Sequence, residues 1–352
     1  MGQPSASLAS AYLPLSRLLC QPSDWRNRLL GVTCFSHVGQ SATLPDTIPL
    51  INVSTTPLLA ASESFCESWL TTSHVWSGKR GAILFRQSEG LLFGCLRVAE
   101  SDCPPINGDG ARTSPLQRAA KFAYREIFDL LDSLDFPHIY RIWNYLPDIH
   151  EESHGMDRYR QFNIGRQEGF LASQRSLDGN VPSASALGSA DGLLSLCFLA
   201  GRGEPPLPVE NPRQISAYHY PQQYGLRAPT FSRATLARIG GQWTLLISGT
   251  ASIVGHQSLH PEDIKAQTKE TLANIESIIK QANLCTDGLR FHRRQLHYKV
   301  YVRRPADAPA IRAEIDHWLG FSTSATFLQA DICRRELLVE IEASGGHTAE
   351  FL

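Results

Sequence analysis

Two glutamates near the end of the sequence could perform acid–base chemistry. Glu340 and Glu342 alternate with the apolar residues Val339 and Ile341 in a stretch that is typical of a β-strand. In a regular strand both carboxyl groups would point to the same face. Because Glu is rarely buried, they could simply be solvated strand residues. A glutamate that is partly desolvated in a cleft would instead have a raised pKa and could donate a proton near neutral pH.

A second motif carries the residue types of a zinc site. His150 to His154 reads HEESH, which matches the HExxH pattern of zinc metalloproteases, where two histidines share one face of a helix. Pro147 and Asp148 stand just before this segment, and Gly155 follows it directly. Because no apolar helical face runs through the segment, we predict a polar loop there and no metal site.

The composition limits the partners of the chain. Its 352 residues carry a formal net charge of -1, which provides no field to attract nucleic acid or an acidic membrane surface. An anionic ligand would therefore depend on local arginines. No apolar run approaches the roughly 18 residues of a transmembrane helix. The eight cysteines include no CxxC pair, which argues against a zinc–cysteine site or a disulfide scaffold and favours the reducing cytoplasm.

One order of elements is expected in each half of the chain, from helical spacing of apolar residues and from runs of β-branched and aromatic ones. In the first half, a strand, a helix and a strand are expected at 91–100, 115–134 and 138–146. In the second half, the same three elements are expected at 243–254, 261–282 and 298–303, with a short helix near 310–319 and strands at 326–332 and 336–342. Pro115 and Pro261 stand at the expected first position of the long helices, where a missing N–H costs nothing.

The repeated strand–helix–strand order predicts two α/β units with helices packed on mixed sheets, related by a pseudo-symmetric duplication. Residues 173–189 and 201–212 are rich in Gly, Pro and Ser and are expected to be loops. We place the linker at 201–212, between an N-terminal unit at 1–200 and a C-terminal unit at 213–352. The first 80 residues carry no motif that we can interpret.

The second half resembles the Rid (YjgF) family. Ser248-Gly249-Thr250 stands where that family typically has Ser-Gly-Gln at the end of a strand, and a long amphipathic helix follows. The segment VEIEA at 339–343 is similar to the terminal strand of that family. The resemblance implies Rid-like units. It also implies a small carboxylate ligand bound between neighbouring units, as in the trimers of that family.

Other segments resemble a narrower family, the chorismatases. The similar segments are DRYRQFNIGR at 157–166, PRQISAYHYPQQYGLRAPTFSRA at 212–234, SGTAS at 248–252 and CRRELLVEIE at 333–342. The resemblance covers most of residues 81–345. It implies a cytoplasmic enzyme of aromatic biosynthesis that cleaves chorismate and releases pyruvate without a cofactor or metal. Members of the family form either a dihydroxycyclohexadiene carboxylate or 3-hydroxybenzoate, sometimes with 4-hydroxybenzoate.

The resemblance also implies roles for individual residues. Glu340 would be the general acid that protonates the enolpyruvyl methylene carbon. Aromatising members tend to carry a cysteine seven residues before this glutamate, and Cys333 has that spacing, so 3-hydroxybenzoate is the expected product. Arginine suits the two carboxylates of chorismate, and tyrosine hydroxyls or a strand end beside a glycine could contact the rest of the ligand. The candidates for substrate binding are Arg160, Arg166, Tyr218, Tyr220, Tyr224, Arg233, Thr250 and Arg303.

Several alternatives stay open. A helix surface would also explain Arg160 and Arg166, packing alone would explain the tyrosines, and Cys333 could be a small apolar filler. The enzyme could be a hydrolytic chorismatase that gives the diene acid. The chain could also be a Rid-like small-molecule binder or imine deaminase. Its assembly could be a monomer or a homo-oligomer, a trimer included.

Overall fold

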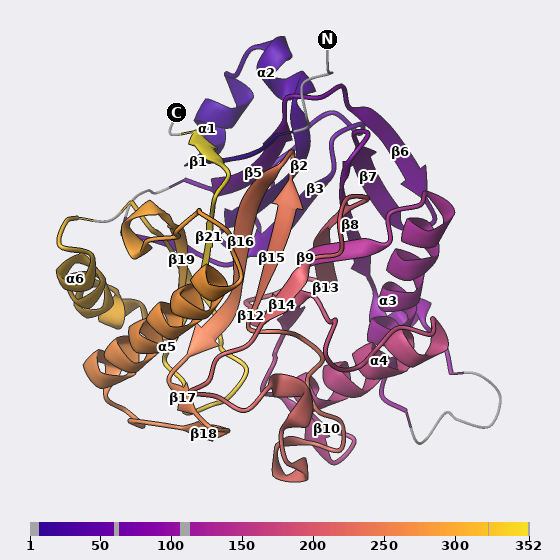
Figure 1. The fold of residues 1–352 in the computed structure, drawn as a ribbon. Coiled ribbons are helices and arrows are strands. Elements are labelled where there is room, and N and C mark those ends of the chain that lie inside the picture. Colours follow the sequence, from indigo (N-terminus) through magenta and orange to yellow (C-terminus); the bar gives the residue numbers. More distant parts are fainter. Residues whose placement is uncertain (1–6, 60–62, 106–112, 323, 351–352) are drawn as a thin grey trace.

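The structure is a computed structural model that describes residues 7–59, 63–105, 113–322 and 324–350. Three large sheets dominate it, and helices cover their outer faces (Figure 1). The smaller elements are α1 (Leu15–Leu19), α2 (Ser23–Asn27), the hairpin β10 (Glu152–Ser153) and β11 (Met156–Asp157), and the hairpin β17 (Ile253–Val254) and β18 (Gln257–Ser258). No helix of the described residues is long and apolar enough to cross a membrane.

The middle part of the chain forms a six-stranded sheet in the order β12-β9-β13-β8-β7-β6. Its strands are β6 (Trp76–Arg80), β7 (Ile83–Gln87), β8 (Leu91–Val98), β9 (His138–Pro147), β12 (Ser183–Ser189) and β13 (Leu194–Gly201). The strands β9 and β12 are parallel, and the other neighbours are antiparallel. The helices α3 (Pro115–Ser133) and α4 (Arg158–Ala172) pack on one face.

The C-terminal part forms a seven-stranded sheet in the order β14-β15-β16-β21-β19-β20-β4. Its strands are β4 (Pro57–Leu58), β14 (Leu207–Val209), β15 (Ala234–Ile239), β16 (Gln242–Ala251), β19 (His297–Val302), β20 (Thr326–Gln329) and β21 (Val339–Gly345). Here β19 and β20 are the parallel pair of the repeated unit. The helices α5 (Ile264–Leu284) and α6 (Ala308–Leu319) cover this sheet.

The two sheets have the same topology. In chain order, β7, β8, α3, β9, α4, β12 and β13 match β15, β16, α5, β19, α6, β20 and β21. The matched strands occupy the same places in their sheets, and the parallel pair falls at the same position. The structure therefore confirms the expected fold class of repeated α/β units with helices on mixed sheets.

Most of the described residues between 8 and 71, joined by one strand from the C-terminus, form a third, reduced unit. The sheet order is β22-β1-β5-β2-β3, with the strands β1 (Leu8–Pro14), β2 (Leu29–Ser36), β3 (Leu50–Ser54), β5 (Phe65–Thr71) and β22 (Thr348–Glu350). The order β3-β2-β5-β1 repeats the order β12-β9-β13-β8, and β2 and β3 are again parallel. Only α1 and α2, of five residues each, stand where the other units have a long helix.

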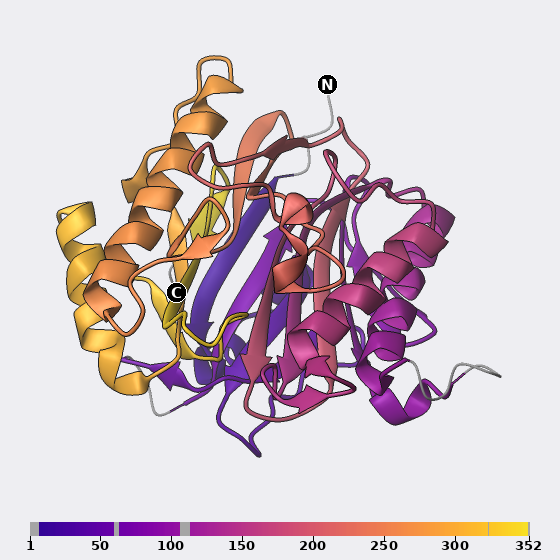
Figure 2. The same cartoon turned by 90° about the horizontal axis from the view of Figure 1, so that it is seen from below.

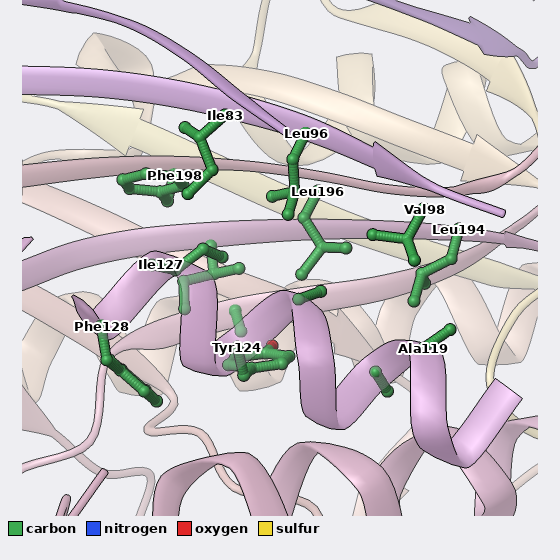
Figure 3. Close-up of a cluster of buried hydrophobic side chains, with 14 of the residues drawn as sticks. Ile83, Leu96, Val98, Ala119, Tyr124, Ile127, Phe128, Leu194, Leu196 and Phe198 are labelled. Carbon is green, nitrogen blue, oxygen red and sulfur yellow. The ribbon is translucent and has the colours of Figure 1, made fainter. Parts of the chain in front are cut away.

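Each sheet of the repeated units buries two faces. In the middle unit, alternate residues of β8 and β13 such as Leu96 and Leu196 pack against α3, as Figure 3 shows for Tyr124 and its neighbours. The opposite residues join a central core that takes side chains from all three sheets. Figure 2 shows these layers, with the strands lying between the helix pair α3 and α4 and the helix pair α5 and α6. The centre of the molecule is thus a junction of three sheets.

Two expectations about local structure were wrong. Residues 183–189 were expected to be part of a loop, but they form the buried strand β12, whose small residues allow close contact with β16. The helix α5 was expected to begin at Pro261 and begins at Ile264 instead. His260 and Glu262 have positive φ angles, so the chain turns there, and the Asp263 side chain caps the helix by accepting a hydrogen bond from the Ala266 N–H.

The proposed division of the chain at 201–212 stays a prediction. Part of this segment is β14, which pairs with β15 and extends the C-terminal sheet. The N-terminal third also contacts that sheet, because β4 pairs with β20.

Candidate active site

A cavity of about 510 Å³ lies where the middle and C-terminal units meet. Its walls come from β12, β16, β21, α4, the segment before β15 and the segment before β21. The residues used below line it: Tyr159, Arg160, Arg166, Ser185, Tyr220, Tyr224, Arg233, Gly249, Cys333, Arg334, Glu336 and Glu340, with His150 at its margin. This position between repeated units is the one that the Rid-like resemblance implied.

Glu340 is a buried acid in this cavity. Along β21, Val339 and Ile341 pack against α5 and α6, while Glu340 and Glu342 point to the inner face, as strand alternation predicted. Both glutamates are about 95% buried, so the alternative of solvated strand acids is wrong. Burial, followed by the neighbouring Glu342 charge, raises the pKa of Glu340 to about 8, and the Arg141 and Arg233 charges oppose that rise. Glu340 can therefore hold a proton at neutral pH.

Gly249 makes room for this acid. The pairing of β16 with β21 shifts between Ile247 and Thr250, which indicates a β-bulge at this point. A Cβ atom on Gly249 would lie 1.9 Å from Oε1 of Glu340, so any side chain there would displace the carboxyl group. Thr250 was expected to contact a ligand, but its hydroxyl donates to the Ser248 carbonyl oxygen at 2.8 Å and it does not line the cavity.

Arg166 and Arg233 are buried cations of the cavity wall. Arg166 is 1% exposed, so the helix-surface explanation is wrong for it, and its Nη2 donates to Asn163 at 2.7 Å. Arg233 donates from Nη2 to the Ile215 carbonyl and to the Tyr220 hydroxyl, both at 2.8 Å. In each guanidinium the buried Nε has no hydrogen-bond partner among the described residues. A buried N–H without a partner is costly, so both groups are suited to an anionic ligand.

A third arginine of the cavity, Arg334, was missed by the sequence analysis. Its guanidinium lies over the ring of Tyr224 at 3.9 Å, and its Nη1 donates to the His256 carbonyl at 2.9 Å and to Ser258 at 3.0 Å. The buried Nη2 has no hydrogen-bond partner in the described part of the chain. Arg334 was recognisable in the segment CRRELLVEIE, which directly precedes and includes the acid, but nothing in its spacing distinguished it from Arg335.

The other predicted arginines have different surroundings. Arg160 lines the mouth of the cavity, with its side chain 41% exposed beside Asp157 at 3.4 Å. Arg303 does not line the cavity, which differs from its expected role in binding. Its guanidinium donates to the Ile332 and Arg334 carbonyls, both at 3.0 Å, and to Nε2 of His150 at 2.8 Å. Arg303 thus holds the segment before β21 in place from behind.

The tyrosines divide in the same way. Tyr220 and Tyr224 line the cavity, and Tyr224 shares a hydrogen bond with Nδ1 of His256 at 3.2 Å. Tyr218 is not among the cavity residues and packs at the edge of the core around α3 and α4. Two of the three predicted tyrosines therefore meet at the cavity.

Cys333 lies in the wall close to the acid. Burial, followed by the nearby Glu340 charge, raises the pKa of its thiol to about 12. The thiol is therefore neutral at physiological pH and is not a reactive thiolate. In this position it can act by its size and by weak hydrogen bonding.

The HEESH segment forms a turn and the first strand, β10, of the short hairpin β10–β11. His154 and Gly155 both have positive φ angles, so the two histidines do not share a helical face. Within the described residues, no three His, Cys, Asp or Glu side chains are placed to hold a metal ion. His150 instead accepts a hydrogen bond from Arg303 at the margin of the cavity.

Comparisons with known proteins cover nearly all of the chain. A family model described as chorismatase FkbO/Hyg5-like, N-terminal, matches residues 67–200. A 3-hydroxybenzoate synthase from Streptomyces hygroscopicus is 34% identical over 95% of this chain and 96% of its own length. The chain belongs to the chorismatase family. A chorismatase from Streptomyces rapamycinicus is 33% identical over 95% of this chain and 98% of its own length.

The chorismatase fold also agrees in three dimensions. A chorismatase crystal structure superposes on this chain with a TM-score of 0.82 and 29% identity, covering 98% of this chain and all of that one. The family relation covers the first 80 residues as well, which have no counterpart in the two-unit pattern expected from the sequence. In this chorismatase-family chain they supply β5 and its buried Glu67, whose contacts are described below.

Proposed function

We propose that this protein cleaves chorismate to pyruvate and 3-hydroxybenzoate, with Glu340 as the general acid. The observation that carries the proposal is a buried carboxyl group with a pKa raised to about 8, in a cavity that is also lined by five arginines. The named activities of the relatives support the choice of substrate and product. Incubation of the protein with chorismate, followed by separation of the products, tests it. Absence of pyruvate and of any ring product would reject the proposal.

The chemistry needs one proton and no cofactor. Glu340 donates its proton to the terminal methylene carbon of the enolpyruvyl ether, which leaves an oxocarbenium centre on the ether carbon. For the hydroxybenzoate, the bond between the ring carbon and the ether oxygen then breaks, pyruvate leaves with that oxygen, and the ring becomes aromatic by losing one proton, which restores the acid. Formation of 3-hydroxybenzoate balances without added water, whereas the dihydroxylated diene acid consumes one water molecule. The cavity wall therefore decides the product by admitting or excluding that water.

The arginines account for the binding of the two substrate carboxylates. We assign Arg166, Arg233 and Arg334 to this role, because each keeps a buried N–H without a partner among the described residues. Tyr220 and Tyr224 fix the orientation of Arg233 and Arg334 through a hydrogen bond and a stacking contact. Arg160 lies at the mouth of the cavity, where water competes with the substrate for its guanidinium group. We also assign the protein to the cytoplasm, where the eight free cysteines of the chain would stay reduced.

The rate is expected to depend on pH through one acidic group. The acid acts only when it is protonated, so kcat/KM is constant below the pKa of Glu340, which is raised to about 8. Above that pH it should fall by about tenfold per pH unit. Initial rates between pH 6 and 10, with protein integrity checked at each pH, measure the curve. A rate that rises with pH across this range, instead of falling, would mean that Glu340 acts as a base.

Gly249→Ala is expected to keep the fold and to lower kcat by at least about tenfold, since a displacement of about 1 Å in an active site can cost 100-fold. The added Cβ would meet the carboxyl group of Glu340 at 1.9 Å, and the acid would have to move. Gly203→Ala is a matched control, because a Cβ there meets atoms only at 3.6 Å or beyond. Equal rates for both variants would show that the position of the acid is not limiting.

Cys333→Ala is expected to keep pyruvate release and to shift the ring product towards the dihydroxylated diene acid. The change removes a sulfur atom from the wall beside Glu340 and makes room for water near the ring. A tenfold change in the product ratio requires only about 1.4 kcal/mol. Chromatography of the ring products from both proteins measures the ratio. An unchanged aromatic fraction would leave Cys333 as a packing residue.

A further inference from the structure

A buried cluster of four charged side chains lies behind the cavity, at the junction of the three sheets. Glu342 of β21 forms ion pairs with Lys299 of β19 at 2.5 Å and with Arg141 of β9. Lys299 forms a second ion pair with Glu67 of β5. The four residues are at most 5% exposed. Tyr301 donates a further hydrogen bond to Glu342 at 3.1 Å, so this carboxylate is held by β19 of its own sheet and by β9 of the middle sheet.

The cluster is connected to the active site through one strand and one serine. Glu342 follows Glu340 by two residues, so both side chains lie on the inner face of β21. Ser185 of β12 lines the cavity, accepts a hydrogen bond from Arg141 and donates one to Glu342, both at 3.1 Å. The Cβ of Ser185 lies 3.2 Å from the position that a Cβ on Gly249 would take. Oε1 of Glu340 lies 1.9 Å from that same position, so Ser185 is close to the acid.

The signs of the charges in this cluster favour a protonated acid. Two cations and two anions balance, and Glu342 is the member of the cluster on the same strand as Glu340. Lys299 and Arg141 keep the pKa of Glu342 below its ordinary value although burial opposes this, so Glu342 is ionised. If Glu342 were neutral, the Arg141 charge would lack its carboxylate partner, and its tendency to lower the pKa of Glu340 would no longer be opposed by the Glu342 charge.

We propose that Glu342 is a positioning residue that keeps Glu340 protonated, by occupying Arg141 and Lys299 and by presenting a fixed negative charge to it. The inference rests on the proposed role of Glu340. It assigns a task to a buried charge cluster whose four members do not line the cavity. Buried ion pairs alone are weak evidence for stabilisation, so stability does not explain why four charges are kept in the protein interior. Control of the protonation of Glu340 would explain it.

The other groups around Glu340 do not supply this effect. Arg233 before β15 and Arg166 of α4 are cations, which would favour ionisation of the acid, and both are assigned to the substrate carboxylates. Tyr159 of α4 and Cys333 before β21 are neutral at physiological pH because burial raises both pKa values. Arg334, Arg335 and Glu336 line the outer wall, and His150 at the margin has a pKa lowered by burial and by Arg303. Among these groups Glu342 is the anion that is buried beside the acid.

Two substitutions should move the protonation of Glu340 in opposite directions. Glu342→Gln removes the anion and should lower the midpoint by at least about one pH unit, the usual effect of a close charge. Arg141→Gln removes a cation and should raise it by about half a pH unit or more. In Arg141→Gln, Glu342 keeps Lys299 and Tyr301 as partners, so this variant still tests whether the charges of the cluster reach Glu340 if Glu342→Gln fails to fold.

The midpoint can be followed without turnover. Infrared difference spectra of the ligand-free protein against Glu340→Gln isolate the carbonyl band of the protonated acid, and its loss with rising pH gives the midpoint. The alkaline fall of kcat/KM should move with it. Glu67→Gln is the matched control, because it breaks an equally buried ion pair on the far side of Lys299 and should move the midpoint less than Glu342→Gln does.

The outcomes separate this inference from the proposed function. If no band of a protonated acid is present near pH 7, the general-acid role of Glu340 fails. If the band is present and its midpoint is unchanged in Glu342→Gln and Arg141→Gln, the role of Glu342 is overturned and Glu340 stays the acid. Midpoints that move in the same direction in both variants would also overturn it. Removal of an anion and removal of a cation should have opposite effects, whereas a general disturbance of packing does not depend on the sign of the lost charge.

Discussion

Glu340→Gln is expected to lose nearly all turnover of chorismate while it keeps the fold and binds the substrate. Glutamine has nearly the same shape as the protonated acid, but its amide cannot deliver a proton to the methylene carbon. A general acid is typically worth about 10²–10⁴-fold in rate. Because the carboxyl group is buried, water reaches this position poorly and cannot efficiently donate the proton in its place. Single-turnover release of pyruvate, followed beside the equilibrium binding of chorismate, measures both quantities.

Glu336→Gln provides the control for this experiment. Glu336 also lines the cavity, but it accepts a hydrogen bond from Ser258 at 2.7 Å and is half-buried. Its replacement should leave the rate within about tenfold of the parent, a small loss beside that of a general acid. A loss below tenfold in Glu340→Gln, or a larger loss in Glu336→Gln, would assign the proton to another group.

Strand periodicity predicted the position of the acid, because alternation is a local property. Val339, Glu340 and Ile341 fix which face each side chain takes, whatever packs on that face. The same reasoning could not tell that the inner face of β21 meets a second sheet, so from periodicity alone a solvated acid was the favoured interpretation. Burial of Glu340 is decided by contacts with β12 and β16, which come from other parts of the chain.

The strand β12 shows why other parts of the site were missed. Its sequence, SASALGS, has the composition of a loop, and strand propensity favours larger side chains. Small residues are needed there because β12 packs against β16 at the junction of two units. Ser185, which joins the cavity to the charge cluster, was therefore hidden in an expected loop. A contact between two units leaves no signal in either unit's own periodicity.

The arginines could be chosen by type but not by role. Arg166 stands on α4 at a position that a helix surface would explain, yet it points into the protein beside Phe162. Arg303 directly follows β19 and supports a neighbouring segment by donating to its carbonyls. Which guanidinium keeps a donor for a ligand depends on the groups of the folded protein that already accept hydrogen bonds from it. The sequence does not show how many such acceptors each arginine has.

Arg233→Ala is expected to weaken chorismate binding by about 1.5–3 kcal/mol, which is roughly 10–150-fold in Kd, the usual scale for a hydrogen bond to a charged group. Arg233 is 4% exposed, and its Nε has no hydrogen-bond partner among the described residues, so a substrate carboxylate would complete its pairing. Calorimetric titration of the catalytically inactive Glu340→Gln background with chorismate measures Kd without turnover. Thermal unfolding of each protein shows whether the fold is kept.

Two further arginines make that experiment specific. Arg160→Ala should change Kd by less than about fivefold, because an exposed ion pair contributes at most about 1 kcal/mol. Arg303→Ala should act mainly on kcat, since Arg303 holds the segment that carries Cys333 and Arg334 and does not line the cavity. An unchanged Kd in folded Arg233→Ala would remove this residue from the site. Equal weakening by all three substitutions would mean that binding depends on the overall charge of the cavity, and the unpaired Nε of Arg233 would then have no part in recognising the carboxylate.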